Sequence, residues 1–322
     1  MKKLSRRLLS AACFLAIACT PESAKKPSSS ARETLRVLTY SSFLGEGSYG
    51  EWLKREFESQ HPHLEVVYVE AQDGAGLAGE LKRRRGDATG RIDLAVGLDE
   101  VTVGRVGREH FARLATISSS PMTILVHRKR ASAALAARKF RFATWRELVD
   151  SKLLEKSLVV QDPRFSAPGL SWLLQTHALA GVTPNAAQGL VRRVFPSWSS
   201  TFAAFDGGEG TAVWTYSSSL SYYECDGKPH ELVALRVDEG YLSSDEIAAV
   251  VQGAVPATEV LLNFLLSGPA QQKLSELNWV YPVGAVTLPK CFVPRESFPR
   301  LPKAASPSAT TVNQWIDEWQ LL

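Results

Sequence analysis

Hydrophobic residues along the first third of the chain switch between two spacings. Apolar runs at 34–40, 63–71 and 91–99 are short and rich in Leu and Val, as expected for buried strands. The segments between them, 49–60 and 76–86, repeat apolar residues at helical spacing. Because strands alternate with helices, this region is predicted to form a parallel sheet with crossover helices, which is an α/β arrangement.

A second series of the same kind follows. Strands are predicted at 121–128, 156–162 and 211–216, and helices at 144–151, 168–181 and 185–195. An apolar run at 247–252, one long helix at 257–277, a loop at 278–289 and a last helix at 311–322 complete the pattern. We expect two α/β lobes with a ligand cleft and hinge between them, lobe I from 34–123 and 241–322 and lobe II from 124–240.

The first 33 residues do not fit this pattern. Residues 1–18 begin with basic side chains and continue with an apolar stretch that is too short to span a bilayer, which is typical of a signal peptide. The small residues before Cys19 resemble a bacterial lipoprotein cleavage box, so we expect cleavage there and lipidation of Cys19. Cleavage and secretion without a lipid is the alternative. Residues 19–33 are rich in Pro, Ser and charge, which is typical of a flexible tether.

Composition supports a globular protein and gives no sign of nucleic-acid binding. The 322 residues are 45% hydrophobic and 22% charged, which is enough for two lobes with their own cores. The formal charge of +4 falls to zero once residues 1–18, with four cations, are removed. The basic run at 81–86 lies where a helix should end, and cations are favourable there.

Cysteine and histidine patterns indicate neither a metal site nor a redox motif. After removal of Cys13 and lipidation of Cys19, Cys225 and Cys291 are left in an oxidising compartment. They could form a disulfide, but the sequence does not give the distance between them. The chain has no C-x-x-C, H-E-x-x-H or G-x-S-x-G motif, so we expect no metal, no cofactor and no catalytic residues.

Candidate ligand-binding residues stand at the ends of the first strands. Tyr40, Asp73-Gly74 and Asp99 follow three successive strands, and in an open α/β sheet the ligand lies beyond these carboxyl ends. Each is also an ordinary turn residue, and only their coincidence favours a site.

The segment 159–174, "VVQDPRFSAPGLSWLL", is a candidate anion site. A strand breaks at Asp162 and a helix is predicted to begin at Pro168, so that the Ser166 hydroxyl and the N–H groups near Gly169 converge at a helix N-terminus. A simple Ser/Pro helix cap is the alternative.

Several aromatic residues do not follow any core period. They lie among serines, asparagine and glycine, which is typical of a cleft that receives a flat heteroaromatic ligand, above all a cation held by ring faces. These residues are Trp198, Tyr216, Tyr222, Tyr223, Trp279 and Tyr281.

Three longer motifs add a family resemblance. "QDPRFSAPGL" at 161–170, "NWVYPVGAVTLP" at 278–289 and "WIDEWQ" at 315–320 resemble conserved stretches of the thiamine-binding proteins of bacterial ABC importers. Weaker similarity in the same order extends over nearly all of 35–320. The resemblance implies a type II periplasmic binding protein fold and a function in solute capture without turnover.

The resemblance also implies roles for individual residues. Ser166, Gly169, Trp198 and Tyr216 would contact the phosphate or hydroxyethyl end of thiamine. Tyr40, Tyr222 and Trp279 would pack on its two rings, and Asp99 would pair with the pyrimidine amine or the cationic ring. The implied partners are thiamine or a thiamine phosphate, an ABC permease and its ATPase, with a monomer anchored by lipid on the periplasmic or cell-surface side of a membrane.

Two segments depart from the family pattern and leave alternatives open. The family's Y-D-S-F is Tyr40-Ser41-Ser42-Phe43 here, and a Trp expected soon afterwards is absent from "GEGSYG", where Tyr49 is a candidate replacement. That segment also matches the dinucleotide fingerprint G-x-G-x-x-G, although it lies four residues beyond the strand. The pair Tyr222-Tyr223 resembles the iron ligands of related binding proteins, so ferric iron is a second candidate ligand.

Overall fold

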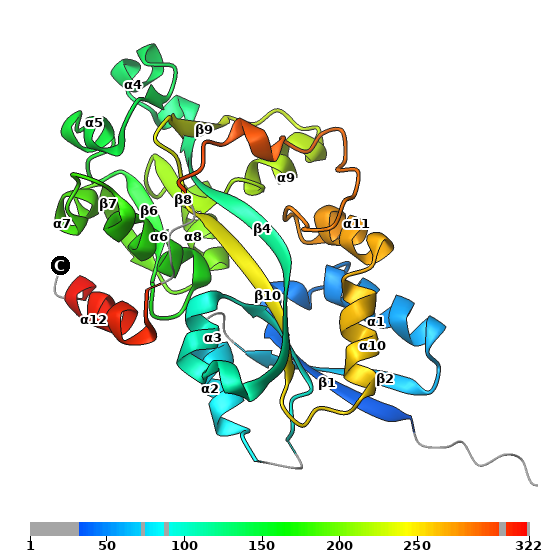
Figure 1. Cartoon of the computed structure of the whole chain (residues 1–322). Helices are drawn as coiled ribbons and strands as arrows, with labels where there is room; N and C mark the ends of the chain where they lie inside the picture. Colours follow the sequence, from blue (N-terminus) through cyan, green and yellow to red (C-terminus); the bar gives the residue numbers. More distant parts are fainter. Residues whose placement is uncertain (1–31, 72–74, 87–89, 303–306, 321–322) are drawn as a thin grey trace, which may run out of the picture. The chain divides into compact units, whose positions relative to one another are not determined.

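The computed structural model describes residues 32–71, 75–86, 90–302 and 307–320 (Figure 1). The predicted signal peptide, Cys19 and Asp73-Gly74 lie outside the described residues. Residues Arg32–Leu322 form one compact unit. No helix in the described ranges is long and apolar enough to cross a membrane.

Strands and helices alternate through most of this unit, as the sequence predicts. The strands are β1 (Glu33–Tyr40), β2 (Leu64–Ala71), β3 (Leu94–Leu98), β4 (Phe111–His127), β5 (Arg141–Phe142), β6 (Leu158–Gln161), β7 (Val191–Phe195), β8 (Ala212–Tyr216), β9 (Leu232–Val237) and β10 (Ser243–Val251). The first helices are α1 (Tyr49–Gln60), α2 (Ala75–Arg83), α3 (Glu100–Val106), α4 (Ala133–Ala137), α5 (Trp145–Asp150) and α6 (Ala167–Ala178). The others are α7 (Pro184–Gln188), α8 (Trp198–Asp206), α9 (Ser219–Asp226), α10 (Ala257–Leu265), α11 (Gly268–Leu277) and α12 (Ala309–Trp319).

The sheet as a whole is mixed, although its first three strands are parallel, as the sequence pattern predicted for that region. Its main path runs β2-β1-β3-β10-β4-β8-β6-β7, with β9 pairing to β4 and β5. The strands β1, β2 and β3 are parallel, and so are β6, β7 and β8. Between these groups, β10 and β4 run antiparallel to their neighbours.

Strand β4 belongs to both halves of the sheet. Its first part pairs with β10, and its last residues, from Met122 on, pair with β8 and β9. The sequence pattern located only the end of this strand, because the part before Pro121 carries three consecutive serines in place of apolar residues. Two of these serines donate hydrogen bonds to acids of β10, Ser118 to Glu246 and Ser119 to Asp245.

Alternation along each strand sends side chains into separate cores on the two faces of the sheet. Leu35 and Val37 of β1 pack with α1, α10 and α11, whereas Leu38 packs with α2 and α3. In the other half, Leu158 and Val160 of β6 pack with α5, α6 and α7. On the opposite face of that half, the core includes α8 and α9 (Figure 1).

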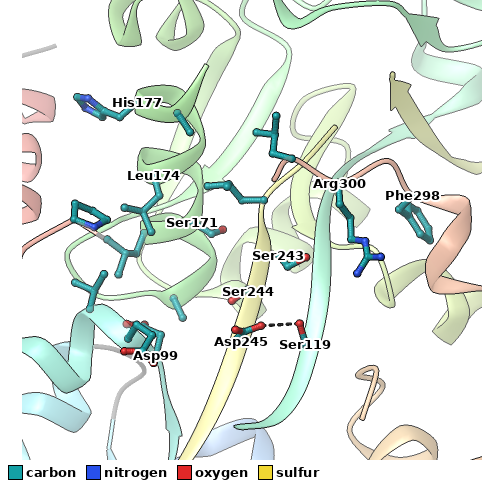
Figure 2. A pocket seen from close by; sticks show the side chains of 18 of the residues that line it. Asp99, Ser119, Ser171, Leu174, His177, Ser243, Ser244, Asp245, Phe298 and Arg300 are labelled. Carbon is teal, nitrogen blue, oxygen red and sulfur yellow. Dashed lines mark hydrogen bonds between the residues drawn. The ribbon is translucent and has the colours of Figure 1, made fainter. Parts of the chain in front are cut away.

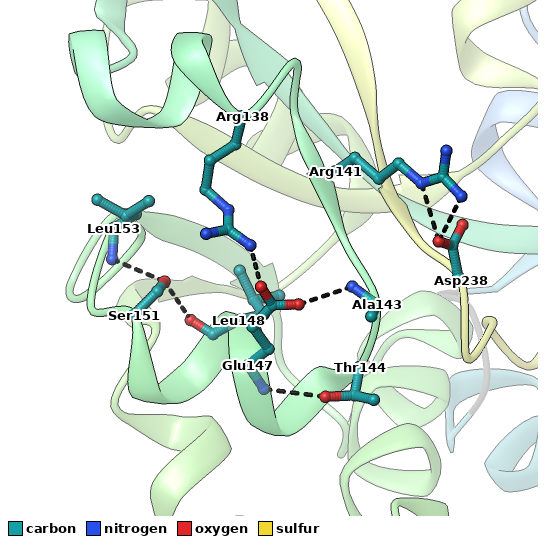
Figure 3. A network of polar contacts seen from close by, with 9 residues as sticks. All are labelled: Arg138, Arg141, Ala143, Thr144, Glu147, Leu148, Ser151, Leu153 and Asp238. Atoms are coloured by element: carbon teal, nitrogen blue, oxygen red, sulfur yellow. Dashed lines mark hydrogen bonds and ion pairs between the residues drawn. The ribbon is translucent and has the colours of Figure 1, made fainter.

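The outer part of the second half is held by polar contacts around α5 (Figure 3). Thr144 caps the helix by accepting a hydrogen bond of 3.1 Å from the Glu147 N–H. The Glu147 carboxylate accepts from the Ala143 N–H at 2.8 Å and pairs with Arg138. Arg141 donates to Asp238 at 2.8 Å and so ties β5 to the end of β9.

Two predicted helices differ from the structure. The segment 257–277 is divided into α10 and α11 at Ser267, because Pro269 occupies the first turn of α11 and cannot continue the preceding helix. The predicted helix at 185–195 ends at Gln188, and "VRRVF" forms strand β7 beside β6. Its valines and phenylalanine favour a strand, which the apolar spacing alone did not reveal.

A disulfide joins Cys225 and Cys291, a pairing that the sequence left open. Their Cα atoms are 5.0 Å apart, and the bond links the end of α9 to the segment that leads from α11 to α12. The Val293 N–H also donates to the Ser221 Oγ at 2.9 Å. This segment is therefore fixed to α9 by both covalent and polar contacts.

Candidate ligand-binding site

Contacts link several of the predicted ligand-binding residues in pairs: Tyr40 interacts electrostatically with Tyr216, the Tyr222 ring contacts Trp279, and Trp198 bonds to Thr215, the residue before Tyr216. We call this group the ring site and define it by Tyr40, Trp198, Tyr216, Tyr222 and Trp279. Tyr40 and Tyr216 are the last residues of β1 and β8, as expected for a site beyond the strand ends.

The Tyr40 hydroxyl is at the centre of a polar network. It donates to Glu246 Oε1 at 2.8 Å and accepts from the Asn278 side-chain amide at 3.0 Å. Burial, and then the negative charge of Glu246, raise the pKa of Tyr40 well above its ordinary value, and Tyr216 is close enough to add to the effect. Tyr40 therefore stays protonated and acts as a donor to the carboxylate.

Tyr222 and Trp279 form an exposed edge of the ring site. Their ring centroids are 5.4 Å apart with the planes at 90°, and Tyr222 is 51% exposed. Trp279 has a positive φ of 52° and is backed by the parallel ring of Phe292 at 6.4 Å. Because Phe292 follows Cys291, the disulfide also supports the Trp279 ring.

Trp198 reaches the same region from the start of α8. Its indole Nε1 donates to Thr215 Oγ1 at 3.0 Å, next to Tyr216. Ser197 and Ser200 form a capping box that fixes the first turn of α8. The position of Trp198 is therefore fixed by its hydrogen bond to Thr215 and by the capping box of the first helical turn.

Ser166 and Gly169 occupy the start of α6, where the sequence predicted an anion site. Ser166 is the N-cap residue, and its buried hydroxyl makes no hydrogen bond within the described part of the chain. The helix begins at Ala167, one residue before the predicted start at Pro168. An anion that accepts a hydrogen bond from the Ser166 hydroxyl would satisfy it.

Close packing against the backbone explains why position 169 is a glycine. A Cβ atom at this position would lie 2.6 Å from the Gln161 carbonyl oxygen and 2.7 Å from that of Asp162. The glycine thus allows α6 to approach the end of β6. Its N–H belongs to the first turn, where no intrahelical acceptor is available.

Asp99 lies elsewhere, in a cavity of about 920 Å³ (Figure 2). It caps α3 by accepting a hydrogen bond of 2.7 Å from the Thr102 N–H, and burial raises the pKa of its carboxyl group. The cavity lining also includes Ser119, Asp245 and Arg300, and none of the five residues that define the ring site. The structure therefore does not bring Asp99 together with the aromatic residues.

The cavity and the ring site are separated by the paired strands β4 and β10. Glu246 is opposite Ser118 in this pair, and Asp245 is opposite Ser119. The Ser118 hydroxyl donates to Glu246 at 3.1 Å, beside Tyr40, whereas Ser119 donates to Asp245 at 2.6 Å in the cavity. Because neighbouring side chains along a strand point to opposite faces, consecutive carboxylates serve two different sites.

Glu246 was not among the residues singled out in the sequence. It precedes the apolar run at 247–252, and the polar residues 243–246 were not assigned to the strand. The alternation of the apolar run, extended from residue 247 back to residue 243, would have placed Asp245 and Glu246 on opposite faces of the sheet.

The G-x-G-x-x-G segment forms a helix start of another kind. Ser48 caps α1, and the Gly47 N–H donates to the Glu51 carboxylate at 2.7 Å, where a dinucleotide would need that N–H for its phosphates. Tyr49 is fully buried against Phe43 and Trp52. Its ring therefore belongs to the core beside the ring site.

The paired tyrosines that suggested iron are engaged in other contacts. The Tyr223 hydroxyl is 3.4 Å from both carboxylate oxygens of Asp206, and the Tyr222 ring meets Trp279. Among the described residues, no group of three or more His, Cys, Asp or Glu side chains could hold a metal ion.

Comparison with known proteins supports the resemblance read from the motifs. No family model matches the chain. The "Thiamine-binding periplasmic protein" of Brucella suis is 29% identical, over 91% of this chain and 93% of that protein. A solved structure called "Periplasmic thiamin binding protein" is 26% identical with a TM-score of 0.73, covering 90% of this chain and 96% of the other.

A more distant structure, iron-bound HitA from Pseudomonas aeruginosa, has a TM-score of 0.68 at 12% identity over 89% of this chain and 99% of its own. This likeness shows the fold alone. The comparisons confirm the similarity to thiamine-binding periplasmic proteins and the type II periplasmic binding protein fold. The chain is a solute-binding protein and not an enzyme, which overturns the dinucleotide alternative.

Proposed function

We propose that this chain captures thiamine or a thiamine phosphate in the ring site and delivers it to an ABC importer. The observation that carries the proposal is the network of Tyr40, Asn278 and Glu246. Tyr216 is close to Tyr40, and Trp279, the residue after Asn278, contacts the ring of Tyr222. Thiamine has a permanent positive charge and two flat rings, and ring faces attract such a cation without any proton transfer. The names of the relatives point to the same ligand.

The phosphate end of the ligand is assigned to the start of α6. The buried Ser166 hydroxyl and the N–H groups of the first helical turn supply donors for an anion. Trp198 and Tyr216 would complete this end, since Tyr216 is the last residue of β8 and the Trp198 indole donates to its neighbour Thr215. The more these donors contribute to the free energy of binding, the more strongly the phosphates are preferred over free thiamine.

Capture requires two lobes that close around the ligand. We assign 34–123 and 241–322 to lobe I and 124–240 to lobe II. The chain crosses between them within β4 and just before β10, and these two crossings are the connection that bends. Closure is favoured by the difference in ligand affinity between the open and closed states. The closed monomer would then dock on the permease, whose ATPase subunits drive import.

The location of the relatives is periplasmic, and we assign the finer details to the N-terminus. Residues 1–18 would be removed and Cys19 acylated, so that residues 20–33 connect the lipid to the compact unit. Mass spectrometry of the chain purified from membranes measures this directly. An unmodified Cys19 after cleavage would support secretion without an anchor.

Calorimetry tests the ligand. Residues 20–322, which include the whole compact unit, are unfolded and refolded to remove bound ligand and titrated with thiamine, thiamine monophosphate and thiamine diphosphate. Binding of one molecule per chain supports the proposal, and the three affinities rank the ligands. A folded protein that gives no heat with any of them contradicts the proposed ligand and leaves the fold unaffected. Titration with ferric iron then tests the second candidate.

A further inference from the structure

We infer that Glu246 is the carboxylate that pairs with the positive charge of the ligand in the ring site. The inference rests on the proposed function and gives one residue a role in selecting cations. It replaces Asp99, which the sequence had suggested for this role and which caps α3 in the cavity.

The position of Glu246 supports this role first. Oε1 accepts from the Tyr40 hydroxyl at 2.8 Å and Oε2 accepts from the Ser118 hydroxyl at 3.1 Å. The two donors come from different strands, β1 and β4, so the carboxylate is held in one orientation. Each carboxylate oxygen can accept more than one hydrogen bond, so these two bonds do not prevent the carboxylate from contacting a ligand as well.

The surroundings of Glu246 strengthen its effect on a cation. Tyr40 links it to Asn278, the residue before Trp279, and its charge also acts on the buried Tyr49. Glu246 itself is only partly buried, so a ligand can approach it. A carboxylate among aromatic rings attracts a cation more strongly than one in open water, because the local dielectric constant is lower. Aromatic faces beside a carboxylate are the chemistry that recognises a permanent organic cation.

The neighbouring acid provides a matched control. Asp245 is the adjacent residue of the same strand, but its carboxylate accepts from Ser119 and lines the cavity on the other side of β4 and β10. Removing its charge changes the net charge of the protein as much as removing that of Glu246. The two acids face different sites, the ring site for Glu246 and the cavity for Asp245.

The test compares Glu246→Gln and Asp245→Asn with two ligands. The first ligand is thiamine, and the second is a neutral analogue in which a carbon atom replaces the thiazolium nitrogen. Glu246→Gln is expected to weaken thiamine about ten- to a hundredfold and the neutral analogue much less, because only thiamine loses a charged partner. Asp245→Asn is expected to bind both ligands as the wild type does.

The outcomes separate the inference from the proposed function. If the wild type binds neither thiamine nor its phosphates, the proposed function fails and the inference fails with it. If the wild type binds thiamine and Glu246→Gln weakens both ligands equally, or neither, only the inference is overturned. Glu246→Asp, which keeps the charge on a shorter side chain, is the second variant if Glu246→Gln does not fold. It is expected to retain the preference of the wild type for thiamine over the neutral analogue, and loss of that preference contradicts the inference.

Discussion

The ring site and the cavity lie on opposite sides of the same two strands, yet they differ in chemistry. The ring site comprises five tyrosine and tryptophan side chains, of which Tyr40 is bonded to Glu246 and Tyr222 is more than half exposed. The cavity is lined mainly by serines, acids and aliphatic residues, together with Phe298, Arg300 and His177 (Figure 2), and Trp315 of the lining stacks on His177. The tyrosines and tryptophans that define the ring site are thus absent from the lining of the cavity.

The register of β10 against β4 decides whether an acid of β10 faces the ring site or the cavity. Asp245 and Glu246 are adjacent, as are Ser118 and Ser119, and each acid pairs with the serine on its own side. A shift of one residue in β10 would exchange the two carboxylates between the sites. The comparison shows that acids near a ligand must be assigned by the face of the strand and not by their nearness in sequence.

Loss of the disulfide is expected to have the largest effect, because it affects both regions. The bond attaches α9, which carries Tyr222, to a segment that continues to Phe298 and Arg300 in the cavity. For Cys225→Ser/Cys291→Ser we expect the free energy of unfolding to fall by about 2–5 kcal/mol, measured by urea denaturation. The wild type with a reducing agent is the control and should show a similar loss. An unchanged stability would mean that hydrogen bonds such as that of Val293 hold the segment alone.

Trp198→Ala is expected to affect the ring site without affecting the cavity. The variant loses a ring and the hydrogen bond to Thr215, so thiamine and both of its phosphates should bind about tenfold to a hundredfold more weakly in calorimetry. Trp315→Ala, on the cavity side, is the matched control and should leave these affinities unchanged. Equal losses in the two variants would contradict the assignment of the ligand to the ring site.

Ser166→Ala tests to which region the start of α6 belongs. The next residue, Ala167, lines the cavity, whereas the proposed anion site places the Ser166 hydroxyl toward the ring site. We expect the thiamine phosphates to bind about tenfold more weakly and free thiamine to change little, because only the phosphates use this donor. If all three forms lose affinity equally, the hydroxyl has no specific part in phosphate binding.

Asp99→Asn is expected to have the smallest effect, and on stability alone. Burial raises the pKa of Asp99 in the folded state, so the folded protein disfavours the charged form. Stability should therefore be higher in acid and fall as the pH rises from the ordinary value toward the raised one. The variant should lose this part of the pH dependence in thermal unfolding, since asparagine caps a helix equally well but does not titrate. A decrease in thiamine affinity would contradict this prediction and indicate that Asp99 contacts the ligand.

The sequence predicted the strand ends that carry Tyr40 and Tyr216 because short apolar runs end there abruptly. It did not predict that β4 begins at Phe111, since serines interrupt the apolar pattern where the strand crosses the centre of the sheet. Asp99 was assigned to the ligand because it follows a strand. The same position also starts a helix, and there its carboxylate is used as a cap. Glu246 was missed because its role depends on contacts with Tyr40 and Ser118, which are distant in sequence.

The bond between Cys225 and Cys291 also determines when the binding surface is completed. Disulfides form in oxidising compartments such as the bacterial periplasm, and these two sulfur atoms belong to residues 66 positions apart in the chain. The backing of Trp279 by Phe292 is thus secured only after export. A molecule retained in the cytoplasm would have the same sequence but would lack the disulfide that supports Phe292 and, through it, the Trp279 ring.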